Sequence, residues 1–160
     1  MLHVALFEPE IPPNTGNIAR LCAATGTRLH LIGRLGFRLD DRALKRAGLD
    51  YWPAVDWIHH RQFADFEASW RESASFSSPR PPRLWLVETP APRPYTQAEF
   101  ADGDCMLFGN ESHGLPPSLR HRFADSLVGI PMPSGQVRSL NLATAVAIVL
   151  YDALRRIHRW

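Results

Sequence analysis

Short apolar blocks, each bounded by turn-forming residues, divide the chain into predicted strands. Blocks of four or five such residues are typical of parallel strands that are buried on both faces. They are predicted at His3–Phe7, Arg28–Ile32, Leu84–Val87 and Cys105–Phe108, with further strands at Val55–Ile58 and Leu127–Ile130.

Helical patterns fill the segments between these blocks. A helix with Ile18, Leu21 and Cys22 on one face is predicted to begin at the capping residues 14–17 and to end at Gly26. The three prolines that precede it exclude a regular helix or central strand over Glu8–Pro13. A short helix is predicted from Asp40 to Ala47, an amphipathic helix around Phe63, Phe66, Ala68 and Trp70, and a surface loop over Ser73–Arg83.

The last helix is predicted to start near Ser139, which would cap it, and to reach about Ile157. Its stretch Leu142–Tyr151 is apolar nearly all round, so it needs burial on two sides. A core helix that also forms a subunit interface would meet that need. Because strands and helices alternate, we expect residues 1–160 to form a single α/β domain with a mostly parallel sheet.

Composition narrows the class of protein without identifying a partner. No apolar run is long enough to span a membrane, and the first residues resemble no export leader, so we expect a cytoplasmic protein. Cys22 and Cys105 lie far apart and are interpreted as buried, reduced thiols. The net charge is only +2, from 18 basic and 16 acidic residues, which does not by itself indicate a nucleic-acid ligand.

The first segment with candidate chemistry is Asn14–Arg20, at a predicted strand-to-helix junction. A helix N-terminus, the amides of Asn14 and Asn17, and Arg20 can together bind a phosphate or a ribose there. The alternative is plain helix capping with a solvated Arg20. The segment is neither a phosphate-binding Walker loop nor a GxGxxG motif.

The second segment is Leu107–Leu115, where a buried strand runs into a polar loop between two glycines. Gly109 can let a ligand approach the backbone, Gly114 can take a positive φ, and Glu111 can accept hydrogen bonds from a loop backbone or a ligand. The alternative is a tight turn with a capping acid. His113 is interpreted as a surface residue. The pair His59-His60 lacks metal-ligand spacing, so no metal site is predicted.

The third segment is Ile130–Leu142, an apolar, proline-containing loop that leads into the last helix. A rigid loop followed by a helix that Ser139 caps would explain much of this segment without a ligand. Asn141 is harder to explain, because a polar amide beside a nearly unbroken apolar stretch needs a specific partner.

The order of the three segments resembles the three signature motifs of the SpoU branch of the SPOUT (SpoU–TrmD) superfamily of RNA methyltransferases. The opening Phe7–Asn17 and the run Arg46–Tyr51 are similar to the smallest bacterial members of that branch. Those members methylate the 2′-hydroxyl of the wobble cytidine or uridine of certain leucine tRNAs. The resemblance covers nearly the whole chain. It departs at Ser73–Arg83, which is longer and richer in proline, and at Asn110, where that group can carry proline.

The resemblance implies an α/β knot, with a deep trefoil knot in the C-terminal half of the chain. It also implies a homodimer whose active site is completed across the subunit interface. The implied cofactor is S-adenosyl-L-methionine, the implied substrate is a tRNA bound through its anticodon stem-loop, and neither a metal nor a membrane is involved.

Candidate site residues follow from matching the motifs position by position. Arg20 matches the catalytic arginine, and because a guanidinium keeps its proton, we expect it to fix a phosphate and stabilise the developing alkoxide. Glu111, Arg138, Ser139 and Asn141 are further candidates for positioning Arg20 or the ribose. The cofactor would be held at Val87, Gly109, Ile130, Met132, Ser139 and Leu140. The RNA would be bound by Asn14, Asn17, Arg20, Tyr151, Arg155 and Arg156, although the basic tail Arg155, Arg156 and Arg159 equally suits a solvated last helical turn.

Three other functions are weighed against this one. Ribose methylation of another tRNA or an rRNA nucleotide would use the same chemistry. A non-catalytic RNA-binding relative would require damage in the three segments, and they are intact. A nucleotide-binding oxidoreductase is disfavoured because the first strand–helix turn lacks the glycine fingerprint.

Overall fold

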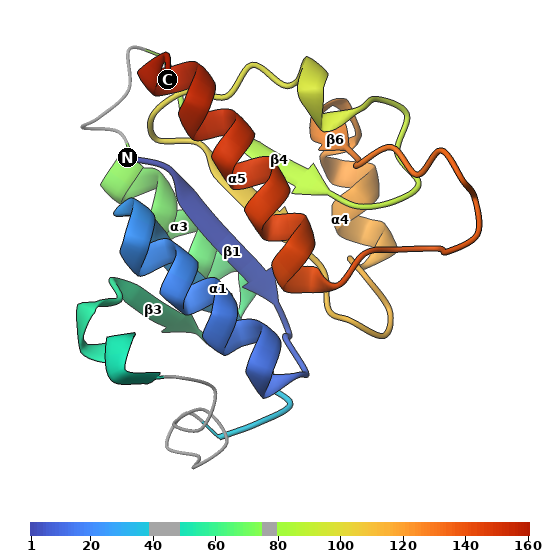
Figure 1. The fold of residues 1–160 in the computed structure, drawn as a ribbon. Helices are drawn as coiled ribbons and strands as arrows, with labels where there is room; N and C mark the ends of the chain where they lie inside the picture. Colours follow the sequence, from blue (N-terminus) through green and yellow to red (C-terminus); the bar gives the residue numbers. More distant parts are fainter. Residues whose placement is uncertain (39–48, 75–79) are drawn as a thin grey trace.

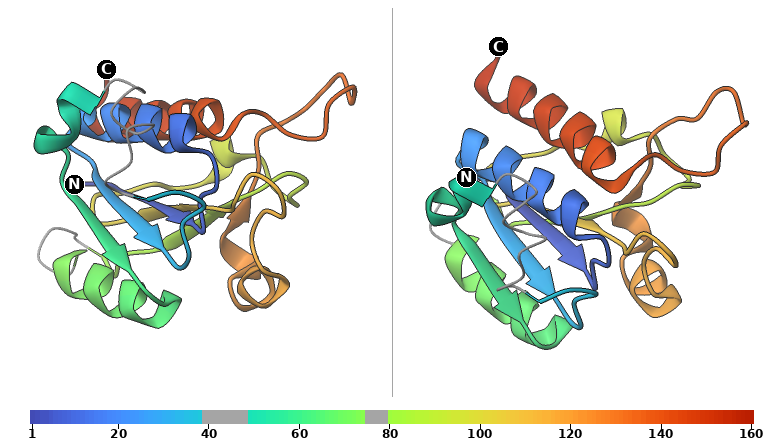
Figure 2. Two further views of the ribbon diagram at one scale, coloured as in Figure 1. Left: turned by 90° about the horizontal axis from the view of Figure 1, so that it is seen from below. Right: turned by 60° about the horizontal axis from the view of Figure 1, so that its bottom comes forward.

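The computed structural model describes residues 1–38, 49–74 and 80–160. A six-stranded sheet in the order β3-β2-β1-β5-β4-β6 forms its centre, and every neighbouring pair is parallel. Two helices, α1 and α5, lie side by side on one face, and α3 covers the other face (Figures 1 and 2). The predicted α/β architecture with a parallel sheet is confirmed.

Four of the six predicted strands have the predicted bounds. The strands are β1 (His3–Phe7), β2 (Arg28–Ile32), β3 (Trp57–His60), β4 (Leu84–Val87), β5 (Cys105–Phe108) and β6 (Leu127–Val128). The prediction of Val55–Ile58 was two residues too early, because Val55 closes a 3-10 turn by donating its N–H to the Trp52 carbonyl. The last strand ends two residues before the predicted Ile130.

Helix α1 (Pro12–Thr25) begins earlier than predicted. Prolines occupy its first positions, where a missing N–H is harmless and a fixed φ favours the helix, so reading them only as helix breakers was wrong. The predicted capping by Asn14 or Thr15 was also wrong, because both side chains are buried inside the first turn and Ile11 is the N-cap. Gly26 ends the helix in the left-handed conformation, with φ 62°, as predicted.

Helix α5 (Leu142–His158) begins three residues after the predicted Ser139. Asn141 is its N-cap: its side-chain oxygen accepts hydrogen bonds from the backbone N–H groups of Ala143 and Thr144, so the capping assigned to Ser139 was wrong. The remaining elements are η1 (Leu49–Ala54), α3 (Phe63–Ala74), η2 (Tyr95–Gln97), α4 (Pro117–Arg122) and η3 (Ala124–Ser126). The helix predicted from Asp40 to Ala47 lies outside the described residues, as do residues 75–79 of the predicted loop, whose first two residues belong to α3.

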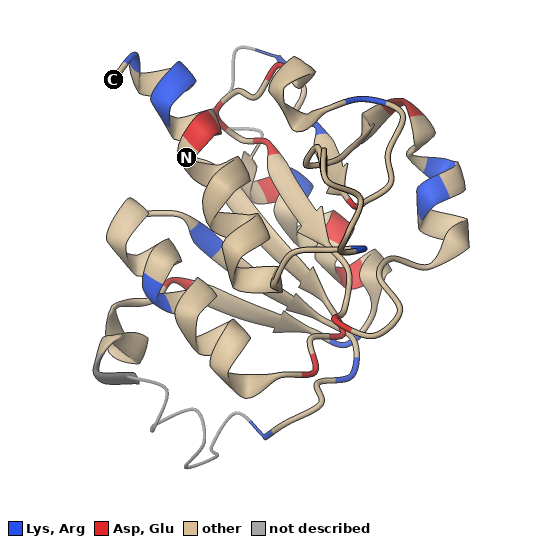
Figure 3. Ribbon diagram, turned by 45° about the vertical axis from the view of Figure 1, so that its right-hand side comes forward, with Lys and Arg blue, Asp and Glu red and all other residues tan. Residues whose placement is uncertain are grey.

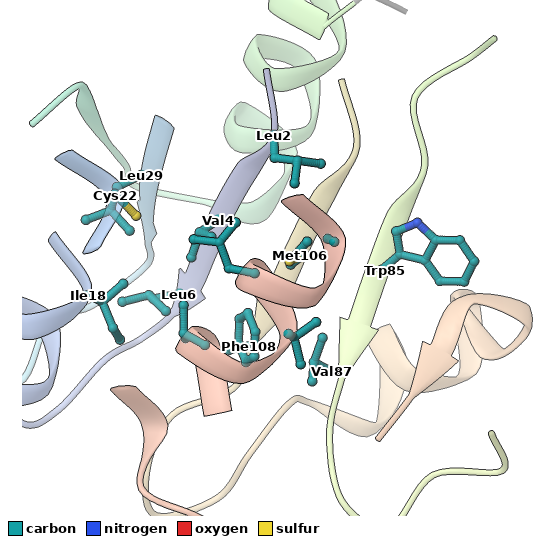
Figure 4. Close-up of a cluster of buried hydrophobic side chains, with 14 of the residues drawn as sticks. Leu2, Val4, Leu6, Ile18, Cys22, Leu29, Trp85, Val87, Met106 and Phe108 are labelled. Atoms are coloured by element: carbon teal, nitrogen blue, oxygen red, sulfur yellow. The ribbon is translucent and has the colours of Figure 1, made fainter. Parts of the chain in front are cut away.

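Alternating strand residues contribute to two apolar cores, one on each face of the sheet. Leu2, Val4, Leu6, Met106 and Phe108 point toward α1 and α5, where they meet the buried sides of both helices (Figure 4). The intervening positions face α3 and pack around its aromatic residues. Both cysteines are buried and unpaired, as predicted, and burial raises the pKa of the Cys22 thiol to about 12. Within the described ranges, no helix combines the length and apolarity needed to cross a membrane.

A chain of three buried histidines runs across β1, β2 and β3 on the α3 side of the sheet. His3 Nδ1 lies 3.0 Å from His30 Nε2, and His30 Nδ1 lies 2.9 Å from His60 Nε2. The Phe66 ring meets His30 and His60 edge-on, which closes the chain off from solvent on that side. Sequence separations of 27 and 30 residues carry no signal for such a chain, and the sequence did not predict it.

The pKa of His3 is lowered to about 4, mainly by burial and also by the nearby charges of Arg28 and the N-terminus, against an opposing effect of Asp56. Burial also lowers the pKa of His30, and the nearby His3, His60 and Arg28 lower it further. The His60 pKa falls through burial and His59, and Asp65 opposes that effect. The folded chain therefore favours the neutral form of these rings.

We expect the protein to lose stability as the pH falls from about 6.5 toward 4. The unfolded chain binds protons near pH 6.5 and the folded chain does not, so acid favours unfolding, by about 2 kcal/mol at pH 5 for a single histidine like His3. Urea unfolding at pH 7.5 and pH 5 measures this difference. His30→Phe should flatten the pH dependence, whereas His113→Gln, at an exposed position, should leave it unchanged. An equal free energy of unfolding at both pH values would contradict the prediction.

Candidate functional site

A pocket of about 520 Å³ opens where β4 and β5 end, at the carboxyl edge of the sheet. Open parallel α/β sheets bind ligands at this edge. All three segments singled out in the sequence contribute to its walls, together with the residues that follow β4. The lining residues are Ile11, Asn14, Val87–Pro90, Phe108–Gly114, Ile130, Arg138–Leu142 and Ala145.

Glu111 joins the second segment to the first. One of its carboxylate oxygens accepts a hydrogen bond from the backbone N–H of Glu10 at 2.8 Å. The other accepts from the backbone N–H of Ile11 at 3.2 Å and from the side-chain amide of Asn14 at 3.1 Å. The interaction is reciprocal, because a Glu10 carboxylate oxygen accepts from the Ser112 N–H at 3.1 Å and from its hydroxyl at 2.5 Å. Of the two partners predicted for Glu111, the structure shows a loop backbone.

Asn14 continues the link to the third segment. Its side-chain oxygen accepts a hydrogen bond at 2.8 Å from the amide of Asn141. The other end of the Asn141 side chain caps α5, so this residue fixes the start of that helix against α1. The specific partner that Asn141 was expected to need is therefore Asn14 on one side and the helix N-terminus on the other.

Two glycines shape the loop between β5 and α4. A Cβ atom at Gly109 would lie 2.1 Å from the Gly114 carbonyl carbon and 2.4 Å from the Leu115 nitrogen, so no side chain fits there. The expected reason was close approach of a ligand, whereas the structure shows a different one, which is close approach of the loop's own backbone. Gly114 has φ 70°, as predicted, and its N–H donates to the Asn110 carbonyl at 3.0 Å.

Glu88 is a pocket residue that the sequence analysis missed. It follows β4 directly, and burial raises the pKa of its carboxyl group against the opposing effects of Arg120 and the Leu115 backbone. A glutamate at the carboxyl end of a buried strand was the available signal.

The structure gathers most of the predicted site residues and leaves others apart. Nine line the pocket: Asn14, Val87, Gly109, Glu111, Ile130, Arg138, Ser139, Leu140 and Asn141. Six do not: Asn17, Arg20, Met132, Tyr151, Arg155 and Arg156. Met132 lies half-buried in the loop before α5.

Arg20 is exposed on the third turn of α1, not at the helix start where it was expected. Its guanidinium carbon lies 4.7 Å from the centre of the Tyr51 ring, and this cation–π contact was not foreseen. Asn17 is exposed one turn earlier on the same helix. Both therefore belong to the outer surface of the chain and not to the wall of the pocket.

The basic residues near the C-terminus are partly engaged within their own helix. Asp152 forms ion pairs with Arg155, at 3.0 Å, and with Arg156. Arg156 also donates to the Ala98 carbonyl at 3.2 Å. Tyr151 is 47% exposed and lies on the side of α5 away from the core. In the part of the chain that the structure describes, no three His, Cys, Asp or Glu side chains cluster as metal ligands would.

Comparison with known proteins gives a consistent result. The SpoU rRNA Methylase family matches residues 1–151. The tRNA (cytidine(34)-2′-O)-methyltransferase of Yersinia pestis is 44% identical to this chain, over 98% of this chain and 94% of the relative.

Solved structures agree with this result. A structure concerned with the 2-OH methylation of C/U34 on tRNA is 46% identical and superposes with a TM-score of 0.88, over 100% of this chain and 98% of its own. An AdoMet-bound rRNA methyltransferase from Sinorhizobium meliloti is 28% identical, with a TM-score of 0.79, over 97% of this chain and 56% of its own.

We expect Glu111→Ala to destabilise the protein by about 2 kcal/mol or more, because it leaves two backbone N–H groups and one amide without their acceptor. Glu111→Gln should have an intermediate effect, since its amide nitrogen would face donors. Urea unfolding measures both, and Glu72→Ala, an exposed glutamate on α3, is the control. A Glu111→Ala variant as stable as that control would contradict the assigned role.

Proposed function

Since the chain belongs to the SpoU rRNA Methylase family, we propose that it transfers a methyl group from S-adenosylmethionine to the ribose 2′-hydroxyl of the wobble pyrimidine of a tRNA. The observation that carries the proposal is the pocket in which the three motif segments meet. The relatives' name, tRNA (cytidine(34)-2′-O)-methyltransferase, supports cytidine at position 34 as the target. Methylation of uridine and the choice of leucine tRNAs are the finer parts of the proposal.

The pocket suits an adenosine-containing cofactor in size and in lining. Its volume of about 520 Å³ lies within the range of small-molecule sites. Val87, Ile130 and Leu140 provide apolar contacts, and the backbone at Gly109 and Ser139 provides polar groups. We propose that these residues hold S-adenosylmethionine, with Met132 nearby, and the bound sulfonium would supply an activated methyl group.

Arg20 is proposed to act on the RNA. A guanidinium keeps its proton at neutral pH, so Arg20 is suited to holding a phosphate and to stabilising negative charge on the 2′-oxygen. Arg138, Ser139 and Asn141 line the pocket and are proposed to position the ribose. Glu111 contributes indirectly by holding Asn14 in place.

Arg20 does not line the pocket of its own chain, but a homodimer would bring it to the pocket of the partner subunit. The outer side of α5 supports an interface: Ile148 is only half-buried there, and Tyr151 is exposed. Helix α1, which carries Arg20 and Asn17, lies beside α5 on the same face of the sheet (Figure 1). We therefore propose that Arg20 of one protomer completes the pocket of the other.

The anticodon stem-loop is the proposed RNA ligand. Basic residues gather on α4 and at the C-terminal end of α5, at opposite ends of the molecule (Figure 3). Asn14, Asn17, Tyr151, Arg155 and Arg156 are the proposed contacts in addition to Arg20. We further propose one methyltransferase domain over residues 1–160, the deep trefoil knot typical of the superfamily, and a cytoplasmic location.

A tRNA with a 2′-deoxyribose at position 34 should accept no methyl group from S-adenosylmethionine, whereas the same tRNA with a ribose there should. Methyl transfer is measured with labelled cofactor, and nucleoside mass spectrometry locates the product. Methylation of the deoxy substrate would show that the target is a base or another nucleotide.

Arg20→Ala should suppress methyl transfer by about a hundredfold or more, the scale for losing one preorganised charge-stabilising group. Cofactor affinity should change little, because the proposed role of Arg20 is toward the RNA and not toward the cofactor. Arg20→Lys should stay severely impaired even at high pH, since lysine cannot make a bidentate phosphate contact. Activity of the lysine variant that rises with lysine deprotonation would instead support proton abstraction from this position.

Mixed dimers test where Arg20 acts. Arg20→Ala and Gly109→Val should each be inactive alone, the second because its side chain collides with the Gly114 backbone. If the sites are composite, equal mixing and exchange of subunits should restore about a quarter of wild-type activity, since half the dimers are mixed and each has one complete site. No recovery, with subunit exchange verified by mass, would show that Arg20 acts within its own chain.

A further inference from the structure

Glu88 lines the pocket and has a carboxylate oxygen without a hydrogen-bond partner among the described residues. The residue follows β4, next to Val87, and its side chain is 16% exposed. Its Oε1 atom lies 3.5 Å from an Arg120 guanidinium nitrogen, and the carboxyl group also accepts from the Leu115 backbone. Its Oε2 atom is buried and finds no hydrogen-bond partner among the described residues. One side of the carboxylate is thus satisfied, and the other is not.

The position of Glu88 places it against the second motif. A Cβ atom at Gly114 would lie 2.5 Å from Glu88 Oε1, so the carboxylate packs directly on the glycine that closes the Gly109–Gly114 loop. Glu111 is the other carboxylate in the pocket wall, and both of its oxygens already accept hydrogen bonds. Of these two carboxylates, only that of Glu88 has an oxygen without any hydrogen-bond partner among the described residues.

The chemistry of the missing partner follows from the charges. Arg120 already provides a cation beside the carboxylate, and the backbone of Leu115 provides a donor. What the buried Oε2 lacks is therefore a hydrogen-bond donor, and a neutral hydroxyl meets that need without adding charge. Adenosine-containing ligands carry such hydroxyls on their ribose, and acidic residues near the ends of parallel strands bind ribose hydroxyls in other open α/β folds.

We infer that Glu88 recognises a ribose hydroxyl of the adenosyl group of the cofactor and thereby distinguishes adenosyl from deoxyadenosyl ligands. The inference rests on the proposed function, because it takes S-adenosylmethionine as the occupant of the pocket. It assigns Glu88 a role in cofactor specificity that none of the motif residues supplies.

Binding of S-adenosylhomocysteine and its 2′-deoxy and 3′-deoxy analogues, measured by calorimetry without RNA, tests the inference. The wild-type protein should bind at least one deoxy analogue about tenfold or more weakly, the scale of a hydrogen bond to a charged group. Equal affinity for all three ligands would overturn the inference. Failure to bind S-adenosylhomocysteine or S-adenosylmethionine at millimolar concentration would overturn the proposed function as well.

Variants of Glu88 separate recognition from a structural role. Glu88→Ala should weaken binding of S-adenosylhomocysteine by about tenfold and should reduce the discrimination against that deoxy analogue to about threefold or less. Glu67→Ala is the matched control, because Glu67 also pairs with an arginine of α4, Arg122, but does not line the pocket. Glu67→Ala should keep the full discrimination, and that result would show that loosening α4 does not cause the loss expected in Glu88→Ala.

Glu88→Met, which keeps the side-chain volume and removes both acceptors, replaces the alanine variant if that protein does not fold. Discrimination that persists in either variant would overturn the inference while leaving the proposed function intact. Two other results would also overturn it. One is loss of discrimination only against S-inosylhomocysteine, which would assign Glu88 to the adenine amine. The other is a much larger effect of Glu88→Gln on S-adenosylmethionine than on S-adenosylhomocysteine, which would assign it to the cation.

Discussion

The carboxylate of Glu111 is the contact on which the geometry of the pocket depends. It accepts hydrogen bonds from the Glu10 N–H, the Ile11 N–H and the Asn14 amide, across about a hundred residues of chain. Hydrogen bonds to an ionised acceptor are stronger than neutral ones, and three donors share this one. Asn14 then passes the constraint to Asn141, 127 residues further along. The end of β1, the loop after β5 and the start of α5 are thereby fixed relative to one another.

This arrangement couples the pocket to the fold. The pocket walls come from segments that meet only after the sheet has formed with β5 beside β1 and β4 beside β5. Gly109 and Gly114 then allow the loop after β5 to fold back on itself within van der Waals distance. A ligand that binds there meets polar groups already held in place, so little ordering free energy is spent on binding. The same coupling means that changes at Asn14, Glu111 or Asn141 should affect stability and function together.

The sequence predicted the strands better than the helix starts. Buried parallel strands are short apolar runs, so β1, β2, β4 and β5 were found with their bounds. The start of a helix depends on which of several polar residues finds a partner in the folded chain, and the tertiary structure determines that partner. Asn141 caps α5 because Asn14 holds its amide. Ser139 was an equally good capping residue by its type and local sequence.

The candidate site was predicted where motif residues lie together and missed where geometry decides. The resemblance identified nine residues that line the pocket. It did not identify Glu88, whose significance comes from a buried oxygen without a partner, nor the Arg20–Tyr51 contact, which joins α1 to η1. The histidine chain was missed for a similar reason, because its members come from three strands and share no spacing. Burial and long-range pairing determine these features, and neither is visible in local sequence patterns.

The hydrogen bonds of the pocket also bear on how the proposed reaction handles its proton. Glu111 is occupied by three donors, and protonating it would break the link between the motifs, so it is poorly suited to act as a base. Glu88 is bound on one side by Arg120 and packs against Gly114, and its proposed partner is the cofactor and not the RNA. In the described pocket wall these are the two carboxylates, and Arg138 is a cation. Neither carboxylate is thus well placed to take the 2′-hydroxyl proton, which would leave to solvent water, and Arg138 is suited to stabilising the negative charge left on the oxygen. With Arg20 added from a second protomer, cationic stabilisation would increase at the point where the alkoxide develops, which explains why the proposed chemistry calls for arginine there.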